Sequence, residues 1–237
     1  MARTDRRGPL GAPMSRAEII GGFLYFPFYL AVVPWLLHWL PAFLWAPLSE
    51  PLANFLYFCV NFIAVLLIFR RWLAASLAGA GRRFWETVQA AVLGFAFYYA
   101  LFWLLSRVFG LLRLEVADPN DAYLRSLDGG GWPLLYIGAL FLVPPAEETL
   151  FRGLIFGNLR ERGRILSYAV SALVFAAAHV WRYIGPVGWT GTLLAALRYL
   201  PAGIALGWCY EKSDTVWAPI VAHSLLNAAA LGLLRLG

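Results

Sequence analysis

The chain has 237 residues, of which 61% are hydrophobic and 14% charged, and its mean hydropathy is +0.68. A soluble globular domain does not carry so apolar a composition, so the sequence indicates an all-α, polytopic membrane protein in a lipid bilayer. The net charge of +6 comes from arginines that flank apolar runs, a pattern typical of topology signals, and we therefore expect no nucleic-acid partner.

The N-terminal part of the chain predicts a short tail followed by three membrane spans. Residues 1–18 are rich in arginine and lack an apolar run of spanning length, so we expect a cytoplasmic tail. The segment 19–131 contains three apolar stretches that are long enough to cross a bilayer at about 1.5 Å per residue. These stretches are residues 19–40, 52–69 and 85–112.

The loops of this part differ in charge. The loop 70–83 begins and ends with arginine pairs and is expected inside, whereas the loop 113–131 is acidic and is expected outside. The acidic residues of the second loop are Glu115, Asp118, Asp121 and Asp128.

The C-terminal part, residues 132–237, predicts four further spans at 132–159, 165–181, 189–210 and 216–234. Pro144 and Pro145 lie in the middle of the fourth span, where we expect a kink or a break. Pro201 interrupts the sixth span, so an additional short helix is an alternative. The sequence thus predicts a bundle of about seven or eight spans. Because the basic turns then fall on one side, the N-terminus is expected in the cytoplasm.

Three short polar clusters interrupt the apolar spans of the C-terminal part. The fourth span carries Glu147, Glu148 and Arg152, the fifth ends on His179, and the seventh carries His223 and Asn227. Ionisable groups at bilayer depth cost about 2.5 to 3.5 kcal/mol each, so they usually face a protein interior or a water-filled cavity. Counted from the nearest basic turn, Glu147 and the two histidines lie at a similar depth of roughly 16 to 20 Å. We therefore expect the clusters to meet in one intramembrane site.

Helical spacing suggests that the polar residues of the site have different roles. Glu148 and Arg152 are four residues apart and share a face, so they are expected to form a supporting ion pair. Glu147 points about 100° away and is the candidate general base. His223 and Asn227 also share a face. Alternatively, each of these features has a purely structural role, as an ion pair or as interhelical hydrogen bonds.

The three clusters match the motifs of a known family. The chain contains Glu-Glu-x-x-x-Arg at 147–152, Phe-x-x-x-His at 175–179 and His-x-x-x-Asn at 223–227, in this order and on separate apolar segments. In this respect it resembles the intramembrane proteases of the CAAX prenyl endopeptidase and bacteriocin-processing group, also called Abi proteins, which include the Ras-converting enzyme. The resemblance covers about residues 144–228, and the first 130 residues carry no diagnostic likeness.

The resemblance implies hydrolysis of a peptide bond in a conical cavity within the membrane. In one scheme Glu147 and His179 activate a water molecule, His223 and Asn227 stabilise the oxyanion, and no metal is needed. In the other, Glu147, His179 and His223 ligate zinc, which would activate the water. The supporting residues are Glu148, Arg152 and Phe175. The sequence leaves both schemes open and slightly favours the first, because asparagine is an unusual zinc ligand but a good oxyanion donor.

The expected substrate is a membrane-anchored protein or peptide, such as a bacteriocin leader, a sorting tail or a CAAX-type tail. The arginine-rich composition, with Lys212 as the single lysine, suggests the cytoplasmic membrane of a prokaryote, where a prenylated tail is a poor candidate. Two other classes of function are alternatives. One is a catalytically inactive immunity or scaffold protein that binds a peptide in the same cavity, and the other is a proton-coupled transporter.

Overall fold

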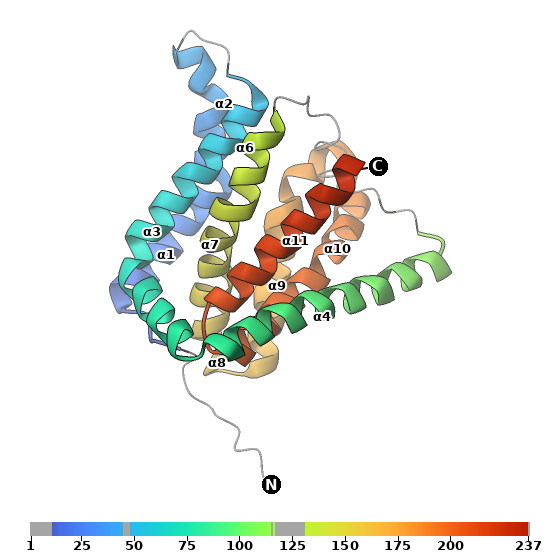
Figure 1. Ribbon diagram of the computed structural model, residues 1–237. Helices are drawn as coiled ribbons and strands as arrows, with labels where there is room; N and C mark the ends of the chain where they lie inside the picture. Colours follow the sequence, from blue (N-terminus) through green and yellow to red (C-terminus); the bar gives the residue numbers. More distant parts are fainter. Residues whose placement is uncertain (1–10, 45–47, 115, 117–130, 237) are drawn as a thin grey trace.

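The computed structural model describes residues 11–44, 48–114, 116 and 131–236, and the ordered elements in this part of the chain are all helical (Figure 1). The acidic loop residues Glu115, Asp118, Asp121 and Asp128 lie outside the described residues, as do the first ten residues of the tail. Seven described helical stretches are long and apolar enough to cross a membrane, which confirms the predicted all-α bundle with seven spans. They are Arg16–Phe43, Glu50–Arg82, Phe84–Leu111, Trp132–Arg160, Arg164–Tyr183, Gly188–Ser213 and Trp217–Leu234.

Helices α1, α3 and α4 belong to the three N-terminal spans. The first span consists of α1 (Arg16–Pro27), a π-helical segment η1 (Phe28–Val32) and α2 (Val33–Leu44). It begins at Ser15, whose side chain and that of Glu18 form a capping box, so the tail is slightly shorter than predicted. The other two spans are α3 (Glu50–Arg82) and α4 (Phe84–Leu111), and α4 lies obliquely across α10 and α11 (Figure 1).

The predicted basic loop 70–83 is wrong, because α3 continues as a helix to Arg82. The helix instead bends at Phe69, whose φ of −104° and ψ of 16° depart from helical values. The bend makes the backbone N–H of Trp72 available, and this group donates to Oε1 of Glu18 in α1 at 2.9 Å. The arginines of residues 70–82 therefore lie on a bent helix, and the carboxylate of Glu18 in the first span stabilises the bend.

The fourth span is continuous through its prolines. It runs through α6 (Trp132–Ile137), π-helical η3 (Gly138–Leu142), α7 (Val143–Glu148), π-helical η4 (Thr149–Gly157) and α8 (Asn158–Arg160). Pro144 and Pro145 lack an N–H group, and the carbonyl oxygens of Ala139 and Leu140, one turn earlier, accept hydrogen bonds from side chains of the last span. The expected break is thus replaced by two π-helical segments, one on each side of the proline pair.

The last three spans are α9 (Arg164–Val180) with the short 3₁₀ turn η5 (Trp181–Tyr183), α10 (Ile184–Ser213) and α11 (Trp217–Leu236). Helix α10 bends at Gly188, with φ 69° and ψ 173°, and passes through Pro201 without a break. No additional helix arises at Pro201. Helices α9 and α10 pack closely, since a Cβ atom at Gly203 would lie 2.9 Å from Cα of Ala172.

The turns after α3, α8 and α10 lie at one end of the bundle (Figure 1). Arg83 forms an ion pair with Asp214 at 3.2 Å, and Arg160 pairs with Glu211 at 3.1 Å. The backbone N–H of Gly11 also donates to Asp214, at 2.7 Å. The basic turns thus share one end of the molecule, and a cytoplasmic location of this end stays a prediction.

Candidate active site

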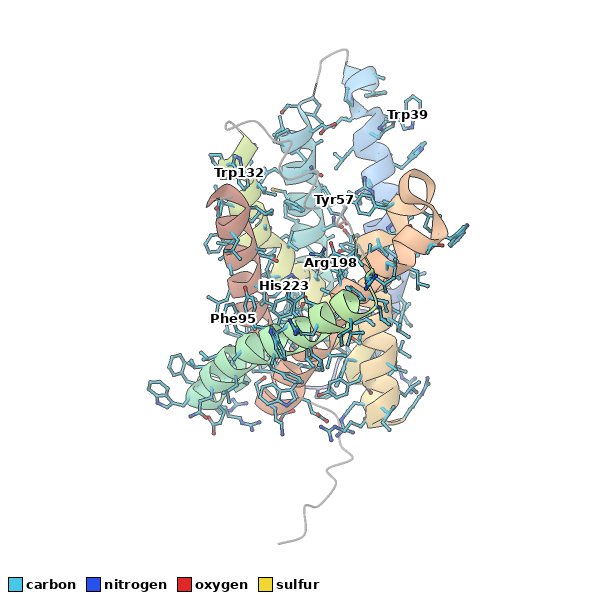
Figure 2. The ribbon with its side chains drawn as sticks, turned by 90° about the vertical axis from the view of Figure 1, so that its right-hand side faces the viewer. Trp39, Tyr57, Phe95, Trp132, Arg198 and His223 are labelled. Carbon is cyan, nitrogen blue, oxygen red and sulfur yellow. The ribbon has the colours of Figure 1, made fainter. Side chains whose placement is uncertain are left out.

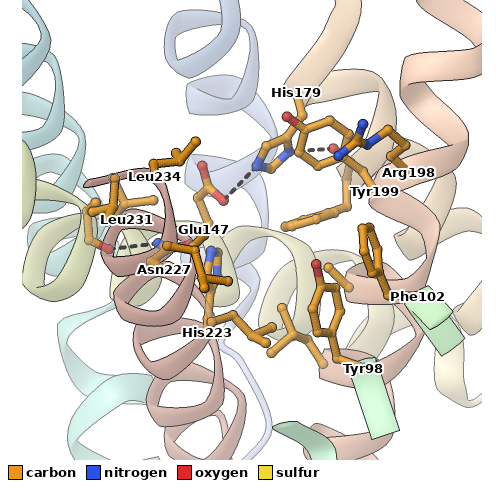
Figure 3. Close-up of a pocket in the computed structure, with 18 of the residues that line it drawn as sticks. Tyr98, Phe102, Glu147, His179, Arg198, Tyr199, His223, Asn227, Leu231 and Leu234 are labelled. Atoms are coloured by element: carbon orange, nitrogen blue, oxygen red, sulfur yellow. Dashed lines mark hydrogen bonds and ion pairs between the residues drawn. The ribbon is translucent and has the colours of Figure 1, made fainter. Parts of the chain in front are cut away.

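Glu147 is the central carboxylate of a buried polar site (Figure 3). It lies on α7, is 8% exposed, and its two oxygens have different surroundings. Oε1 accepts a hydrogen bond of 2.7 Å from the hydroxyl of Tyr29, which comes from the first span. Oε2 has no hydrogen-bond partner among the described residues and lies 3.6 Å from Nε2 of His179. This separation is longer than a direct hydrogen bond, and a bridging water fits such a distance.

His179 presents one ring nitrogen to Glu147. Its Nδ1 lies 2.8 Å from the carbonyl oxygen of Phe175, one helical turn earlier, and must carry a proton to donate to it. In the neutral tautomer Nε2 is therefore an acceptor that faces the cavity. The ring lies between Phe175 and Tyr199, with centroid distances of 4.3 and 4.6 Å. These contacts fix the orientation of the imidazole.

Glu148, Arg152 and His223 form a second polar cluster next to Glu147. The guanidinium of Arg152 is fully buried and contacts both oxygens of Glu148, at 3.1 and 3.2 Å. Nδ1 of His223 donates to Oε1 of Glu148 at 2.7 Å. Arg152 also donates to the carbonyl oxygen of Gly203 at 3.1 Å, and its guanidinium stacks on the ring of Phe175 at 4.6 Å. Glu148 thus connects the predicted supporting ion pair to the predicted site histidine.

Asn227 and Ser224 attach α11 to the π-helical segment η3. Nδ2 of Asn227 donates to the carbonyl oxygen of Ala139 at 2.8 Å, and the hydroxyl of Ser224 donates to that of Leu140 at 2.8 Å. One N–H of the Asn227 amide is engaged in this way, which leaves its second N–H for another acceptor. A π-helical segment at such a position is common next to functional sites.

A cavity of about 540 Å³ joins these groups. Its polar wall contains Glu147, His179, His223 and Asn227, together with Arg198 and Tyr199 of α10 (Figure 3). The rest of the lining is mainly apolar and aromatic, with Phe58 from α3 and a group from α4 that consists of Tyr98, Tyr99 and Phe102. Trp39 and Trp132 lie toward one end of the bundle, whereas His223 and Arg198 lie nearer its middle (Figure 2).

The structure brings all seven site residues predicted from the sequence into one region. Sequence reasoning missed that Glu148 contacts His223 and that Tyr29 contacts Glu147. Tyr29 belongs to an aromatic-rich apolar span, where nothing distinguishes it from a residue facing lipid or the membrane interface. The aromatic wall from α4 was missed for the same reason. Their roles in a reaction stay predictions.

The residues expected to ligate zinc do not converge on one position. In the part of the chain that the structure describes, no group of three His, Cys, Asp or Glu side chains is arranged to hold a metal ion. His223 uses Nδ1 for Glu148, and His179 uses Nδ1 for a backbone carbonyl, so each ring offers only Nε2. As arranged here, the donors do not form a three-ligand zinc site, and we derive no step through a metal.

The fold and this site define an integral membrane protein, a seven-span helical bundle with a glutamate and histidine site inside it. Residues 129–229 match the family model described as Type II CAAX prenyl endopeptidase Rce1-like. This match covers less than half of the chain, and it supports the resemblance to the CAAX prenyl endopeptidase and bacteriocin-processing group that the motifs predicted. The matched segment contains the whole polar site except Tyr29.

Two curated proteins are similar to part of the chain. The protein named "Putative membrane peptidase YdiL", from Bacillus subtilis (strain 168), is 28% identical over 96 residues, which cover 40% of this chain and 35% of that protein. The UPF0177 protein YxdF of Lactococcus lactis subsp. lactis (strain IL1403) is 29% identical over 86 residues, 36% of this chain and 42% of that protein. The chain thus spans less than half the length of these relatives. No solved structure shows a significant match to the chain.

Proposed function

We propose that the protein is an intramembrane endopeptidase that hydrolyses a peptide bond of a membrane-anchored protein or peptide. The observation that carries the proposal is the position of Glu147. Its Oε2 has no hydrogen-bond partner among the described residues and faces Nε2 of His179 at 3.6 Å, and the residue borders a cavity of about 540 Å³. Glu148, by contrast, does not line the cavity, and both of its oxygens lie within 3.2 Å of the fully buried guanidinium of Arg152.

The proposed reaction begins with a water molecule held between Glu147 and His179. Oε2 of Glu147 accepts a proton from this water while the oxygen of the water attacks the carbonyl carbon of the scissile bond. The tetrahedral intermediate then collapses, the C–N bond breaks, and Glu147 returns the proton to the leaving nitrogen. The products are a new carboxyl group and a new amine, so atoms and protons balance without a further reactant.

His223 and Asn227 are proposed to stabilise the oxyanion of the intermediate. With Nδ1 bonded to Glu148, Nε2 of His223 remains for the oxyanion, and a proton on this nitrogen would donate to it. The second N–H of the Asn227 amide is an additional donor beside the bond to Ala139. The supporting roles of Arg152 and Phe175 are to hold Glu148 and His179 in place.

The lining of the cavity supports an apolar peptide as substrate. Aromatic side chains from α3, α4 and α10 form much of the wall, and they would pack against apolar residues that flank the scissile bond. The proposed substrates are a leader peptide or a sorting tail that is anchored in the same membrane. A prenylated CAAX-type tail is a further substrate to be tested. Each reporter is offered from either side of the membrane.

The decisive experiment measures cleavage of a membrane-anchored reporter peptide by the purified full chain in lipid nanodiscs. We expect Glu147→Gln to lower kcat by roughly 10²- to 10⁴-fold, because it removes the general base. Glu161→Gln is the matched control, since Glu161 lies in an exposed turn after α8 and should leave kcat unchanged. A folded Glu147→Gln protein that cleaves at the wild-type rate would overturn the proposal.

The same preparation distinguishes the remaining alternatives. Cleavage that is insensitive to a chelator, in protein without bound metal by elemental analysis, supports the scheme with Glu147 as base. Near-stoichiometric zinc with chelator-sensitive cleavage would assign Glu147, His179 and His223 as ligands after a rearrangement of the site. Wild-type protein that binds the peptide without cleaving it would be a scaffold or immunity protein, and proton-driven uptake into vesicles would indicate a transporter.

A further inference from the structure

Tyr29 is the one described side chain from the N-terminal spans that donates a hydrogen bond to the proposed general base. It lies in η1 of the first span, is 5% exposed, and its hydroxyl is 2.7 Å from Oε1 of Glu147. The residue lies 100 positions before the segment that matches the family model. Its contact with Glu147 therefore adds a feature of this chain that the three motifs do not contain.

The contact makes the two oxygens of Glu147 unequal. The terminal torsion of a glutamate is broad, so an unrestrained carboxylate exchanges its two oxygens easily. The hydroxyl of Tyr29 holds Oε1, and as a consequence Oε2 is the oxygen that faces His179 at 3.6 Å. The space between Oε2 and Nε2 of His179 is where the proposed mechanism needs its water.

Tyr29 is itself fixed by its surroundings. Its ring packs edge-on against Phe151 of η4, with a centroid distance of 6.3 Å, and lies 6.0 Å from the ring of Tyr57. The hydroxyl of Tyr57 donates to the backbone carbonyl oxygen of Tyr29 at 3.1 Å. These contacts connect the first span, α3 and the fourth span around the base. A fixed donor restrains its acceptor more than a mobile one does.

We propose that Tyr29 is a positioning residue that aims Oε2 of Glu147 at the catalytic water. This inference rests on the proposed peptidase function. Tyr29 does not line the cavity, so its effect passes through Glu147 and not through contact with the substrate. Loss of its hydroxyl should therefore lower kcat and leave KM unchanged.

The first test compares Tyr29→Phe with Tyr25→Phe. Tyr25 lies one turn earlier on the same span and donates to Oδ1 of Asn61 at 2.6 Å instead of to Glu147, so it is a matched control. We expect Tyr29→Phe to lower kcat by roughly 10- to 100-fold, the range of a lost hydrogen bond to a charged group. Tyr25→Phe should stay within about twofold of wild type. Equal kcat values in the two variants would overturn the inference.

A second pair of variants removes the effect of packing. At position 29, p-aminophenylalanine keeps an N–H donor, whereas p-methylphenylalanine has a similar size and no donor. The inference requires that the amino variant retains most of the wild-type kcat and that the methyl variant loses as much as Tyr29→Phe. Equal loss in both, with unchanged melting temperatures, would mean that the donor is irrelevant. If Tyr29→Phe does not fold, this pair still shows whether the donor at position 29 contributes to kcat.

A third measurement does not depend on cleavage. If the hydroxyl acts through Glu147, Tyr29→Phe should lower the melting temperature less in a Glu147→Ala background than in the wild type. Equal shifts in both backgrounds would contradict the contact. Failure of the peptidase proposal is recognised separately, because the wild-type protein would then cleave nothing while this coupling could still be measured.

Discussion

The first three membrane-spanning helices and the last four differ in how much they bury. In the most apolar 18-residue window of each of the first three, 17% of the residues are buried, compared with 33–50% in the last four. Residues Phe23, Trp35, Leu67 and Trp85 are examples of large apolar side chains that the N-terminal spans leave exposed. The N-terminal spans therefore offer most of their surface to lipid, whereas the C-terminal spans form a packed core around polar groups.

This difference explains where sequence similarity is found. A helix that faces lipid needs only apolar side chains, and many sequences satisfy this demand. Buried charges inside a membrane need partners at defined positions, as Arg152 has in Glu148 and Gly203. The family match accordingly covers residues 129–229 and leaves the first three spans out. The contact of Tyr29 with Glu147 is an exception, because there a lipid-facing span reaches the site.

The largest expected effect on stability is in the packed core, at Arg152. Its side chain is completely buried, and its polar contacts all lie in the C-terminal spans. Arg152→Met leaves the buried carboxylate of Glu148 without a guanidinium and with His223 as its remaining side-chain contact among the described residues, and we expect it to lower the free energy of unfolding by about 3 to 5 kcal/mol. Thermal unfolding in detergent, monitored by tryptophan fluorescence, measures the loss.

A double variant is the control for this prediction. Glu148→Gln combined with Arg152→Met removes both charges, so it should destabilise the protein by clearly less than the sum of the two single variants. Additive effects would show that the two groups do not depend on each other. The core would then not be distinguished from the N-terminal spans by charges that depend on each other.

The identity of the core site could be predicted from the sequence because polar residues are rare in apolar segments. Each of Glu147, His179 and His223 stands out against its neighbours, and their similar depth follows from the rise of the helix. The pairing of Glu148 with Arg152 follows from their spacing of four residues and is present in the structure. These inferences depend only on positions along single helices.

Contacts between helices could not be predicted in the same way. The bond from His223 to Glu148 depends on how α11 and the fourth span rotate against each other, which spacing within one helix does not specify. The bend at Phe69 depends on a tertiary partner, Glu18, and the π-helical segment before Pro144 is contacted by side chains of α11. The arginine pair at the end of the second apolar stretch resembled the end of a helix, and the structure instead continues the helix through it.

An intermediate effect is expected where the N-terminal spans touch the core, at Gly153. A Cβ atom there would lie 2.5 Å from Cη2 of Trp72 and 2.8 Å from Cε of Met14, both in the N-terminal part. Met14 can move, but the Trp72 indole is wedged against the fourth span and its Nε1 is bonded to the carbonyl oxygen of Ala12. We expect Gly153→Ala to lower the free energy of unfolding by about 1 to 3 kcal/mol through overpacking.

The matched control for this prediction is Gly79→Ala in α3. No atom in the described part of the chain lies within 4 Å of a Cβ atom at Gly79, so the substitution should be neutral or stabilise the helix by up to about 1 kcal/mol. Both variants are compared by thermal unfolding under one set of conditions. If Gly153→Ala were as stable as Gly79→Ala, the N-terminal spans would be free to shift relative to the core.

The smallest expected effect lies where the two regions meet at the basic end of the bundle. Arg83, between α3 and α4, pairs with Asp214, between α10 and α11, at 3.2 Å, and the two side chains are 43% and 39% exposed. Water and salt weaken such a pair, and Asp214 also accepts from the N–H of Gly11. We expect Arg83→Ala to cost under about 1 kcal/mol at low salt, with the difference from wild type shrinking further at high salt. Unfolding curves at the two salt concentrations measure this, and a large, salt-independent loss would mean that this exposed contact, and not the buried packing at Gly153, holds the regions together.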